Sequence, residues 1–145
     1  IEEHFNLKQG IVVSPDFGGI KRARKFANEL HLDMASVEKR RDLKTGQVTT
    51  TKLDGDVEGK TVFIFDDAIL SGQTVVEVAK LLKEKGAKEI HFLATHGVFT
   101  GDALKNLENS MVDSVTITNS IERPEQYKKI TVLDISKTLV DNLQG

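Results

Sequence analysis

Short apolar runs alternate along this chain with segments whose apolar residues recur at helical spacing, and no other feature constrains the fold as strongly. The clearest run is TVFIF at residues 61–65, which is continuous in the manner of a strand buried on both faces of a sheet. It leads into a helical pattern (Val75, Val78, Leu82) that ends near Gly86, where a helix C-cap is expected. Repetition of this unit is typical of βαβ proteins. We therefore predict an α/β fold: an open, mostly parallel β-sheet of five or six strands with helices on both faces.

The remaining strands and helices are predicted from the same two patterns, the short apolar run and the apolar residues at helical spacing. Further strands are expected at 11–13, 34–37, 90–95, 115–118 and 130–133, and further helices at 20–30, 102–107 and from Ser136 onward. Residues 39–60 interrupt this order because they are polar, contain three glycines and show almost no apolar periodicity. We predict a mobile loop there, with a short hairpin through 48–51 as the alternative. The length of 145 residues is that of one domain, 1–145.

Composition excludes several classes of function. The chain has no cysteine, which removes disulfides, thiolate metal sites and a cysteine nucleophile, and fits a reducing compartment such as the cytoplasm. Its 20 basic and 22 acidic residues give a formal net charge of -2, so no global basic field favours nucleic-acid binding. No apolar run approaches the length of roughly 18 residues that a membrane span needs. We expect neither a nucleic-acid partner nor a membrane.

The strand at 61–65 is followed by a predicted turn at 66–74, which begins with two carboxylates, Asp66 and Asp67, and ends in Ser-Gly-x-Thr (71–74) at the start of the next helix. In open α/β sheets, ligands bind beyond the carboxyl ends of the strands. Backbone N–H groups at a helix start, together with two hydroxyls, suit a phosphate. Adjacent carboxylates suit sugar hydroxyls, or Mg²⁺ held through water. The alternative is that the two aspartates only cap the helix and keep the strand end soluble.

Two more segments follow predicted strands at the same edge. SPDFGG at 14–19 places Asp16 before paired glycines, which allow positive φ and close approach of a ligand, although a plain strand-to-helix turn would look similar. EKRR at 38–41 is a basic cluster that can close over a phosphorylated substrate, or can simply be a solvated loop. His96 follows a strand as well, and lies either at the edge of the site or packed locally. Together, the three segments complement a sugar phosphate with Mg²⁺.

These segments resemble a known family. The stretch from Val62 to Thr74 is similar to the phosphoribosyl pyrophosphate motif of type I phosphoribosyltransferase folds. More specifically, SPDFGGIKRARKFA, VEKRR, LDGDVEGKTVFIFDD and KGAKEIHFLATHGVFTGDAL resemble ribose-phosphate pyrophosphokinases (phosphoribosyl pyrophosphate synthetases), in the right order from about Ile11 to the final helix. The resemblance implies Mg²⁺-dependent transfer of pyrophosphate from ATP to the anomeric oxygen of ribose 5-phosphate, with release of AMP, in nucleotide biosynthesis.

The resemblance also implies a role for each matching residue. Asp16 would help to hold Mg²⁺, and Lys39 and Arg41 would be the catalytic cations that stabilise the transferring β-phosphoryl group. Ribose hydroxyls and the 5-phosphate would contact the segment that comprises Asp66, Asp67, Leu70, Ser71, Gly72, Gln73 and Thr74.

The same resemblance leaves alternatives open. It covers the C-terminal one of two stacked copies of the fold, and the chain begins at Ile1, so we expect either one half of a longer enzyme or a solitary domain, and a homo-oligomer. Leu70 and Gln73 depart from the family pattern, which favours a non-catalytic regulatory homologue, whereas retention of Lys39 and Arg41 argues against one. A phosphoribosyltransferase that uses phosphoribosyl pyrophosphate would need a hood over the base, and residues 119–129 are a poor candidate for it.

Overall fold

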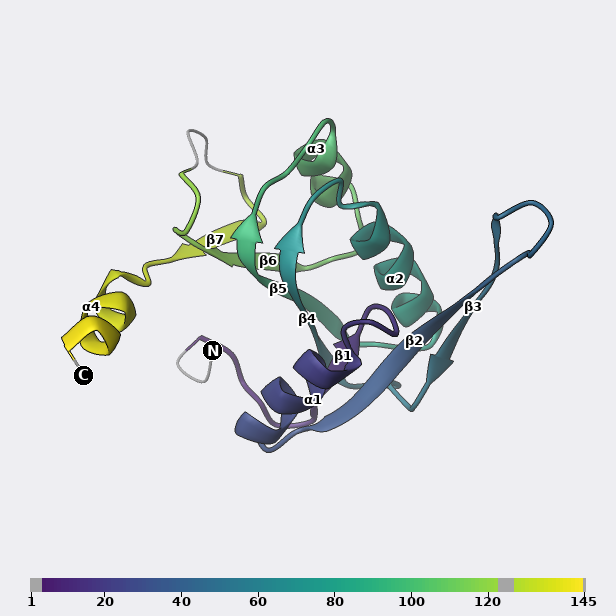
Figure 1. The fold of residues 1–145 in the computed structure, drawn as a ribbon. Coiled ribbons are helices and arrows are strands. Elements are labelled where there is room, and N and C mark those ends of the chain that lie inside the picture. Colours follow the sequence, from purple (N-terminus) through teal and green to yellow (C-terminus); the bar gives the residue numbers. More distant parts are fainter. Residues whose placement is uncertain (1–3, 123–126, 145) are drawn as a thin grey trace.

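The computed structural model describes residues 4–122 and 127–144, and these residues build one seven-stranded sheet with helices against it (Figure 1). The helices are α1 (Ile20–Glu29), α2 (Gln73–Glu84), α3 (Ala103–Glu108) and α4 (Ser136–Gln144). The strands are β1 (Gly10–Ser14), β2 (Asp33–Arg41), β3 (Val48–Asp54), β4 (Thr61–Ile69), β5 (Glu89–Gly97), β6 (Ser114–Thr118) and β7 (Ile130–Leu133). The predicted α/β class is confirmed, with one strand more than the five or six expected.

The strand order is β3-β2-β1-β4-β5-β6-β7, and every neighbouring pair is parallel except β2 and β3. From β1 the chain moves outward to β2, whereas from β4 it moves outward in the opposite direction to β5. The order therefore reverses between β1 and β4, which pair with Val13 opposite Ile64. A crevice at such a reversal, beyond the carboxyl ends of the two strands, is where open α/β sheets bind ligands.

Helices cover both faces of the sheet, as predicted. On one face α1 packs over β1, β2 and β4, around a cluster that includes Val12, Ala27 and Phe63. On the other face α2 and α3 cover the larger core, in which Ile64 and Leu82 are fully buried. Helix α4 lies beyond β7, away from both layers (Figure 1). None of the described helices is long and apolar enough to cross a membrane.

The segment 39–60, predicted as a loop, contains the end of β2 and all of β3. The expected lack of regular structure is wrong and the alternative of a hairpin is correct, with a second strand that is longer than 48–51, while the mobility of the segment stays a prediction. The two strands pair antiparallel, with Lys39 opposite Thr51 and a register shift at Arg40/Arg41. Asp42 fixes the turn: its Oδ1 accepts the backbone N–H groups of Lys44 and Thr45, at 2.6 and 3.0 Å. The hairpin tip extends beyond the helices (Figure 1), so its residues, mostly polar but including the fully exposed Leu43, show no helical or core pattern.

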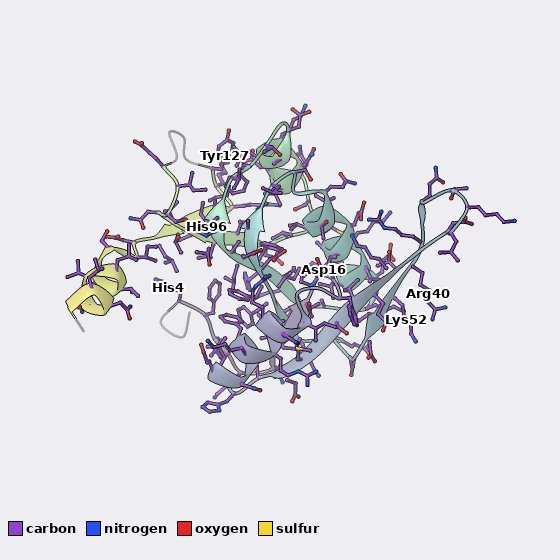
Figure 2. All side chains as sticks on the ribbon, in the orientation of Figure 1. His4, Asp16, Arg40, Lys52, His96 and Tyr127 are labelled. Atoms are coloured by element: carbon purple, nitrogen blue, oxygen red, sulfur yellow. The ribbon has the colours of Figure 1, made fainter. Side chains whose placement is uncertain are left out.

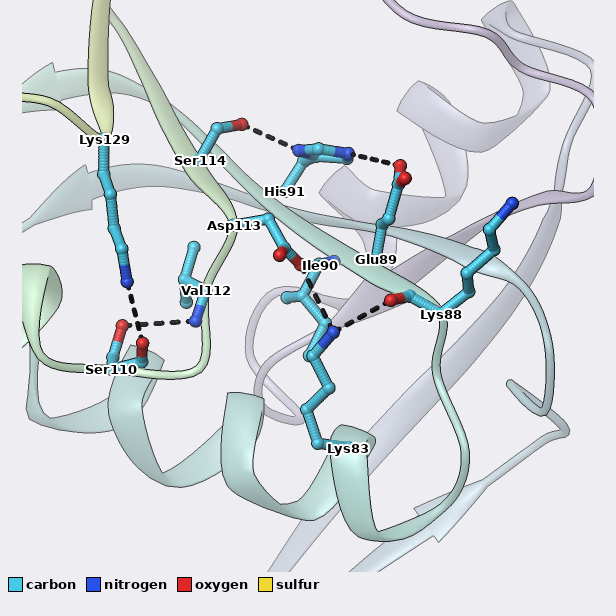
Figure 3. A network of polar contacts seen from close by, with 10 residues as sticks. All are labelled: Lys83, Lys88, Glu89, Ile90, His91, Ser110, Val112, Asp113, Ser114 and Lys129. Atoms are coloured by element: carbon cyan, nitrogen blue, oxygen red, sulfur yellow. Dashed lines mark hydrogen bonds and ion pairs between the residues drawn. The ribbon is translucent and has the colours of Figure 1, made fainter.

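A polar network fixes the opposite, amino-terminal edge of the sheet (Figure 3). The Lys83 ammonium, near the end of α2, donates to the Lys88 carbonyl at 2.9 Å and pairs with Asp113 at 3.3 Å. Asp113 in turn accepts the Ile90 backbone N–H at 2.8 Å. Gly86, with φ +89°, lies just past the last helical turn, where the sequence predicted a C-cap. The network therefore ties the end of α2 to the starts of β5 and β6.

Candidate functional site

A cavity of about 220 Å³ lies at the carboxyl ends of β1 and β4, where the strand order reverses. Its lining combines carboxylates, hydroxyls and the start of α2: Asp16, Asp66, Ala68, Ile69, Leu70, Ser71, Gly72, Thr74, Val75 and Phe92. Six of the residues singled out from the sequence thus meet around one cavity. Asp67, Gln73, Lys39 and Arg41 are not among its lining residues.

The two adjacent aspartates lie inside β4 rather than after it. The strand continues to Ile69 because the ladder to β5 continues, with Asp66 opposite Ala94 and Ile69 opposite Gly97. Successive side chains of a strand point to opposite faces. Asp66 accordingly lines the 220 Å³ cavity, whereas Asp67 lines a second cavity of about 350 Å³ beside α1. The sequence-based placement of both carboxylates in a turn was wrong, and they do not share one cavity.

Arg22, on α1, joins the two carboxylates. Its Nη1 lies 2.8 Å from Asp66 Oδ1 and its Nη2 lies 3.3 Å from Asp67 Oδ2. Burial of Asp66, followed by its hydrogen-bonded contact with Asp67, raises the pKa of Asp66 to about 6. The pKa of Asp67 is lowered, by its contact with Asp66 and by the charge of Arg22. The site thus holds one readily ionised carboxylate and one that takes up a proton in mildly acidic solution.

Asp16 lies in the loop between β1 and α1 (Figure 2) and is held by its own loop. Its Oδ1 accepts the Gly19 N–H at 2.7 Å, and its carbonyl accepts the Ser14 hydroxyl at 2.7 Å. Gly18 and Gly19 do not adopt the positive φ that the sequence suggested. Gly19 is favoured by close packing instead, since a Cβ would lie 3.2 Å from Ser14 Oγ and 3.3 Å from Asp16 Oδ1 and would displace these side chains.

The turn between β4 and α2 has the geometry of an anion site. Gly72 has φ +73° directly before the helix, and a Cβ there would lie 3.3 Å from the Leu107 side chain, so glycine is required. The first N–H groups of a helix have no acceptor within the helix and favour negative charge. The Ser71 hydroxyl accepts the Gln73 N–H at 3.4 Å. Leu70, which departs from the family pattern, is 57% exposed at the lip of the cavity.

The two expected catalytic cations lie on the β2–β3 hairpin. Lys39, two residues beyond the buried Val37, lies on the same face of β2, and Arg41 is exposed beyond the register shift at Arg40/Arg41. Lys39 reaches α2, where its ammonium pairs with Glu77 at 3.1 Å. Within the described parts of the chain, Arg41 has no hydrogen bond or ion pair to another side chain. Arg40 and Lys52 point to the other face of the hairpin (Figure 2).

The oxygen ligands at the cavity fit Mg²⁺ only if a substrate phosphate supplies further ligands. Over residues 4–122 and 127–144, no group of three His, Cys, Asp or Glu side chains is placed to hold a metal ion. Mg²⁺ commonly keeps several waters and takes one or two carboxylates plus substrate phosphates. The Asp16 carboxylate lies at the cavity, and one of its oxygens accepts the Gly19 backbone N–H. Asp66 lines the same cavity. These two residues are therefore compatible with an ion that is shared with a phosphate ligand.

Sequence reasoning missed two charged residues, Arg22 and Glu77. Arg22 lies within the quoted SPDFGGIKRARKFA segment, and Glu77 lies four residues after Gln73, at the spacing that brings helical side chains together. The position of either residue in the sequence does not identify its partner on another element, which is Asp66 for Arg22 and Lys39 for Glu77. His96 contacts Ser120 Oγ at 2.7 Å and is not among the cavity's lining residues, which supports local packing. The segment 119–129 lies partly outside the described residues.

Comparison with known proteins agrees with this architecture. Residues 42–144 match the model of the phosphoribosyl synthetase-associated domain. A curated ribose-phosphate pyrophosphokinase from Vibrio cholerae is 42% identical over 143 residues, which are 96% of this chain and 45% of the relative. The crystal structure of phosphoribosylpyrophosphate synthetase from Mycobacterium smegmatis aligns with a TM-score of 0.86 and 33% identity, over 98% of this chain and 46% of that one.

A more distant match shows the fold alone. The structure of APRTase from Giardia lamblia complexed with 9-deazaadenine has a TM-score of 0.60 at 12% identity, over 87% of this chain and 68% of that one. The family model and the two synthetase relatives, by contrast, confirm the resemblance inferred from the sequence motifs. The chain spans a little under half the length of the synthetase relatives that it matches.

Proposed function

Because this chain belongs to the phosphoribosyl synthetase-associated domain family, we propose that it supplies the ribose-phosphate-binding half of an enzyme that makes phosphoribosyl pyrophosphate. In this reaction the anomeric oxygen of ribose 5-phosphate forms a bond to the β-phosphorus of ATP. The bond from that phosphorus to the oxygen of the α-phosphate breaks, AMP leaves, and the hydroxyl proton is released. The observation that carries the proposal is the 220 Å³ cavity, which joins Asp16 and Asp66 to the Ser71–Gly72 turn.

The cavity matches the two ends of a ribose 5-phosphate. Ser71, Thr74 and the first N–H groups of α2 would bind the phosphate, because a helix start and two hydroxyls offer donors to an anion. Asp66 would accept hydrogen bonds from ribose hydroxyls on the opposite side of the cavity. Arg22 keeps Asp66 oriented through the 2.8 Å contact. Asp67, on the other face of β4, orients Arg22 and does not line the cavity.

The remaining roles concern the transferred group. Asp16 and Asp66 would hold Mg²⁺ together with substrate phosphates, and that ion would neutralise phosphate charge. Lys39 and Arg41 would supply positive charge to the transferring phosphoryl group from the hairpin. Phosphoryl transfer depends mainly on such positioning and charge neutralisation, so the chain's residues need no covalent step. A cytoplasmic location and a homo-oligomer follow from the resemblance and stay predictions.

Calorimetric titration of the purified chain with ribose 5-phosphate in Mg²⁺ tests the proposal. We expect sub-millimolar binding by the wild-type chain, a loss of about tenfold or more in Asp66→Asn, and no change in Asp33→Asn. Asp33 is a matched control, since it is an exposed aspartate at the opposite, amino-terminal end of β2. A thermal unfolding curve for each variant checks that the fold is kept.

The other outcomes select between the alternatives. No binding by the wild-type chain would contradict the proposal and favour a non-catalytic homologue in which Leu70 has weakened the phosphate turn. Binding that both asparagine variants share would place the sugar phosphate outside the cavity. Binding of phosphoribosyl pyrophosphate in preference to ribose 5-phosphate would favour a phosphoribosyltransferase.

A further inference from the structure

Lys39, Gln73 and Glu77 form a chain of side chains beside the proposed phosphate turn. The Lys39 ammonium lies 3.1 Å from Glu77 Oε2, and the Gln73 amide Nε2 donates to Glu77 Oε1 at 3.0 Å. Both carboxylate oxygens of Glu77 are therefore engaged. Gln73 is the first residue of α2, directly after Gly72, and Glu77 follows one helical turn later. The contact thus brings the hairpin cation within about one turn of the proposed phosphate turn.

The backbone directs Lys39 to this position. Ala35 and Val37 are buried against the α2 side of the sheet, and Lys39 is the next residue of β2 on that face. The Lys39 side chain is only 20% exposed, whereas that of Glu77 is 45% exposed. The hydrogen bond from Gln73, together with the charge of Lys39, lowers the pKa of Glu77, so the carboxylate stays ionised at neutral pH. The ammonium is consequently paired with a fixed anion while the site holds no ligand.

A paired ammonium is less available to a phosphate than an unpaired one. A ligand that recruits Lys39 must compete with Glu77, because the same N–H donors would have to turn from the carboxylate to the phosphate. Ion pairs of this exposure contribute only modestly, so the competition costs a ligand about two- to fivefold in affinity. The 220 Å³ cavity does not include Lys39, so a ligand confined to the cavity avoids the competition.

We propose that Glu77, oriented by Gln73, is a specificity-determining residue that withholds Lys39 from the site until a ligand with linked phosphates displaces its carboxylate. The ligand class is a polyphosphate, either inorganic pyrophosphate or the phosphate chain of a nucleoside triphosphate. A monophosphate seated at the Ser71–Gly72 turn is indifferent to Glu77. This inference rests on the proposed function for the identity of the cavity ligand. The contacts of Glu77 with Lys39 and Gln73 are independent of that function.

The rate at which an N-hydroxysuccinimide ester acylates each lysine, measured by peptide mass spectrometry on the full chain, tests this. In Glu77→Gln we expect Lys39 to be acylated about two- to fivefold faster than in the wild type, because the isosteric amide no longer holds the ammonium. Gln73→Ala should give a smaller increase. Asp113→Asn is the control, since it breaks the second lysine–carboxylate pair, Lys83–Asp113, and should leave the Lys39 rate unchanged.

Inorganic pyrophosphate in Mg²⁺ is the probe for the ligand class. It should protect Lys39 in Glu77→Gln at about two- to fivefold lower concentration than in the wild type, while calorimetry gives the same ribose 5-phosphate affinity for both. Equal Lys39 rates in the two proteins would overturn the proposed role of Glu77. Faster acylation with unchanged protection, or with none, would overturn the polyphosphate assignment. Failure of ribose 5-phosphate to bind the wild-type chain would defeat the proposed function, while the acylation rates would still decide the role of Glu77.

Discussion

Two lysine–carboxylate pairs of similar exposure lie at opposite edges of the sheet. The side chains of Lys83 and Asp113 at the amino edge are 27% and 45% exposed, and those of Lys39 and Glu77 at the carboxyl edge are 20% and 45% exposed. Their surroundings differ. The amino-edge pair also bonds the backbone, at the Lys88 carbonyl and the Ile90 N–H (Figure 3). The carboxyl-edge pair is held by one further side chain, that of Gln73.

This difference separates a structural contact from an exchangeable one. Breaking the amino-edge pair leaves a part-buried backbone donor without its acceptor, which costs stability. Breaking the carboxyl-edge pair leaves two charged groups that water or a ligand can satisfy. The same holds for Arg22, whose contacts at the carboxyl edge are with the Asp66 and Asp67 side chains. The ion pairs of Lys39 and Arg22 at this edge thus involve side chains alone, so a ligand can replace the partner of either cation, whereas Asp16 and Asp66 also accept backbone N–H groups of neighbouring residues.

The largest expected effect is at the amino edge. Asp113→Ala removes the acceptor of the Ile90 N–H and the partner of Lys83, and should lower the free energy of unfolding by about 2 kcal/mol. Urea denaturation measures this loss. Ribose 5-phosphate affinity, measured well below the unfolding transition, should not change. A loss of stability below about 0.5 kcal/mol would remove the contrast between the edges.

The next largest effect is at the carboxyl edge, where we expect a change in ligand affinity with little change in stability. Ser71→Ala removes an exposed hydroxyl from the proposed phosphate turn, and should weaken ribose 5-phosphate binding about tenfold with little change in stability. Calorimetry and thermal unfolding measure the two quantities. Ser114→Ala is the matched control, since its hydroxyl contacts His91 Nδ1 at the amino-terminal end of β6 and should affect stability alone. Equal affinity in wild type and Ser71→Ala would place the phosphate elsewhere.

A smaller effect concerns pH. In the folded chain Asp66 has a pKa raised to about 6, above its ordinary value of 3.8, so between these values the folded state binds more protons than the unfolded state. The contribution of Asp66 to stability therefore increases as pH falls from 7 to 5, by about 1 kcal/mol after allowance for its partial exposure. Denaturation of the wild type and Asp66→Asn at both pH values measures this difference. A gap between the two proteins that is constant with pH would contradict the raised pKa.

The smallest effect should come from Leu70. Leu70→Ser restores a hydrogen-bonding group to the lip of the cavity and should tighten ribose 5-phosphate binding by about two- to threefold. Stability should change little, because the side chain is 57% exposed. Leu139→Ser, at a leucine that is 55% exposed on α4, is the matched control and should leave the affinity as it is. Weaker binding in Leu70→Ser would mean that the leucine itself contacts the ligand.

Sequence patterns predicted the parts of the fold whose residues repeat with a regular period. Buried runs such as Thr61–Phe65 and the apolar face of α2 were recognised because their periodicity follows directly from burial. The hairpin was missed as the main prediction because its strands are polar beyond the helices and leave no apolar alternation. The end of β4 was missed for a related reason: pairing with β5, and not side-chain polarity, determines where that strand stops.

The candidate site was predicted in composition but not in arrangement. Position near the carboxyl end of a strand was enough to bring Asp16, Asp66 and Ser71 to one edge of the sheet. It could not assign Asp66 and Asp67 to different cavities, since that depends on whether the backbone is a strand or a turn there. The contacts from Arg22 and Glu77 cross between elements, and a spacing along one element does not identify a partner on another.

The antiparallel pairing of β2 and β3 has a consequence for timing. The hairpin turn closes between Asp42 and Gln47, neighbours in sequence, whereas the parallel pair β1–β4 joins Ile11 to Val62. A hairpin forms within roughly 1–10 μs, far faster than a sheet that must bring distant segments together. The β2–β3 pairing can therefore form early in folding, before the distant β1 and β4 segments come together. Lys39 and Arg41 thus lie on a segment whose local contacts form early in folding, whereas the cavity that they would serve is complete only after β1 and β4 have paired.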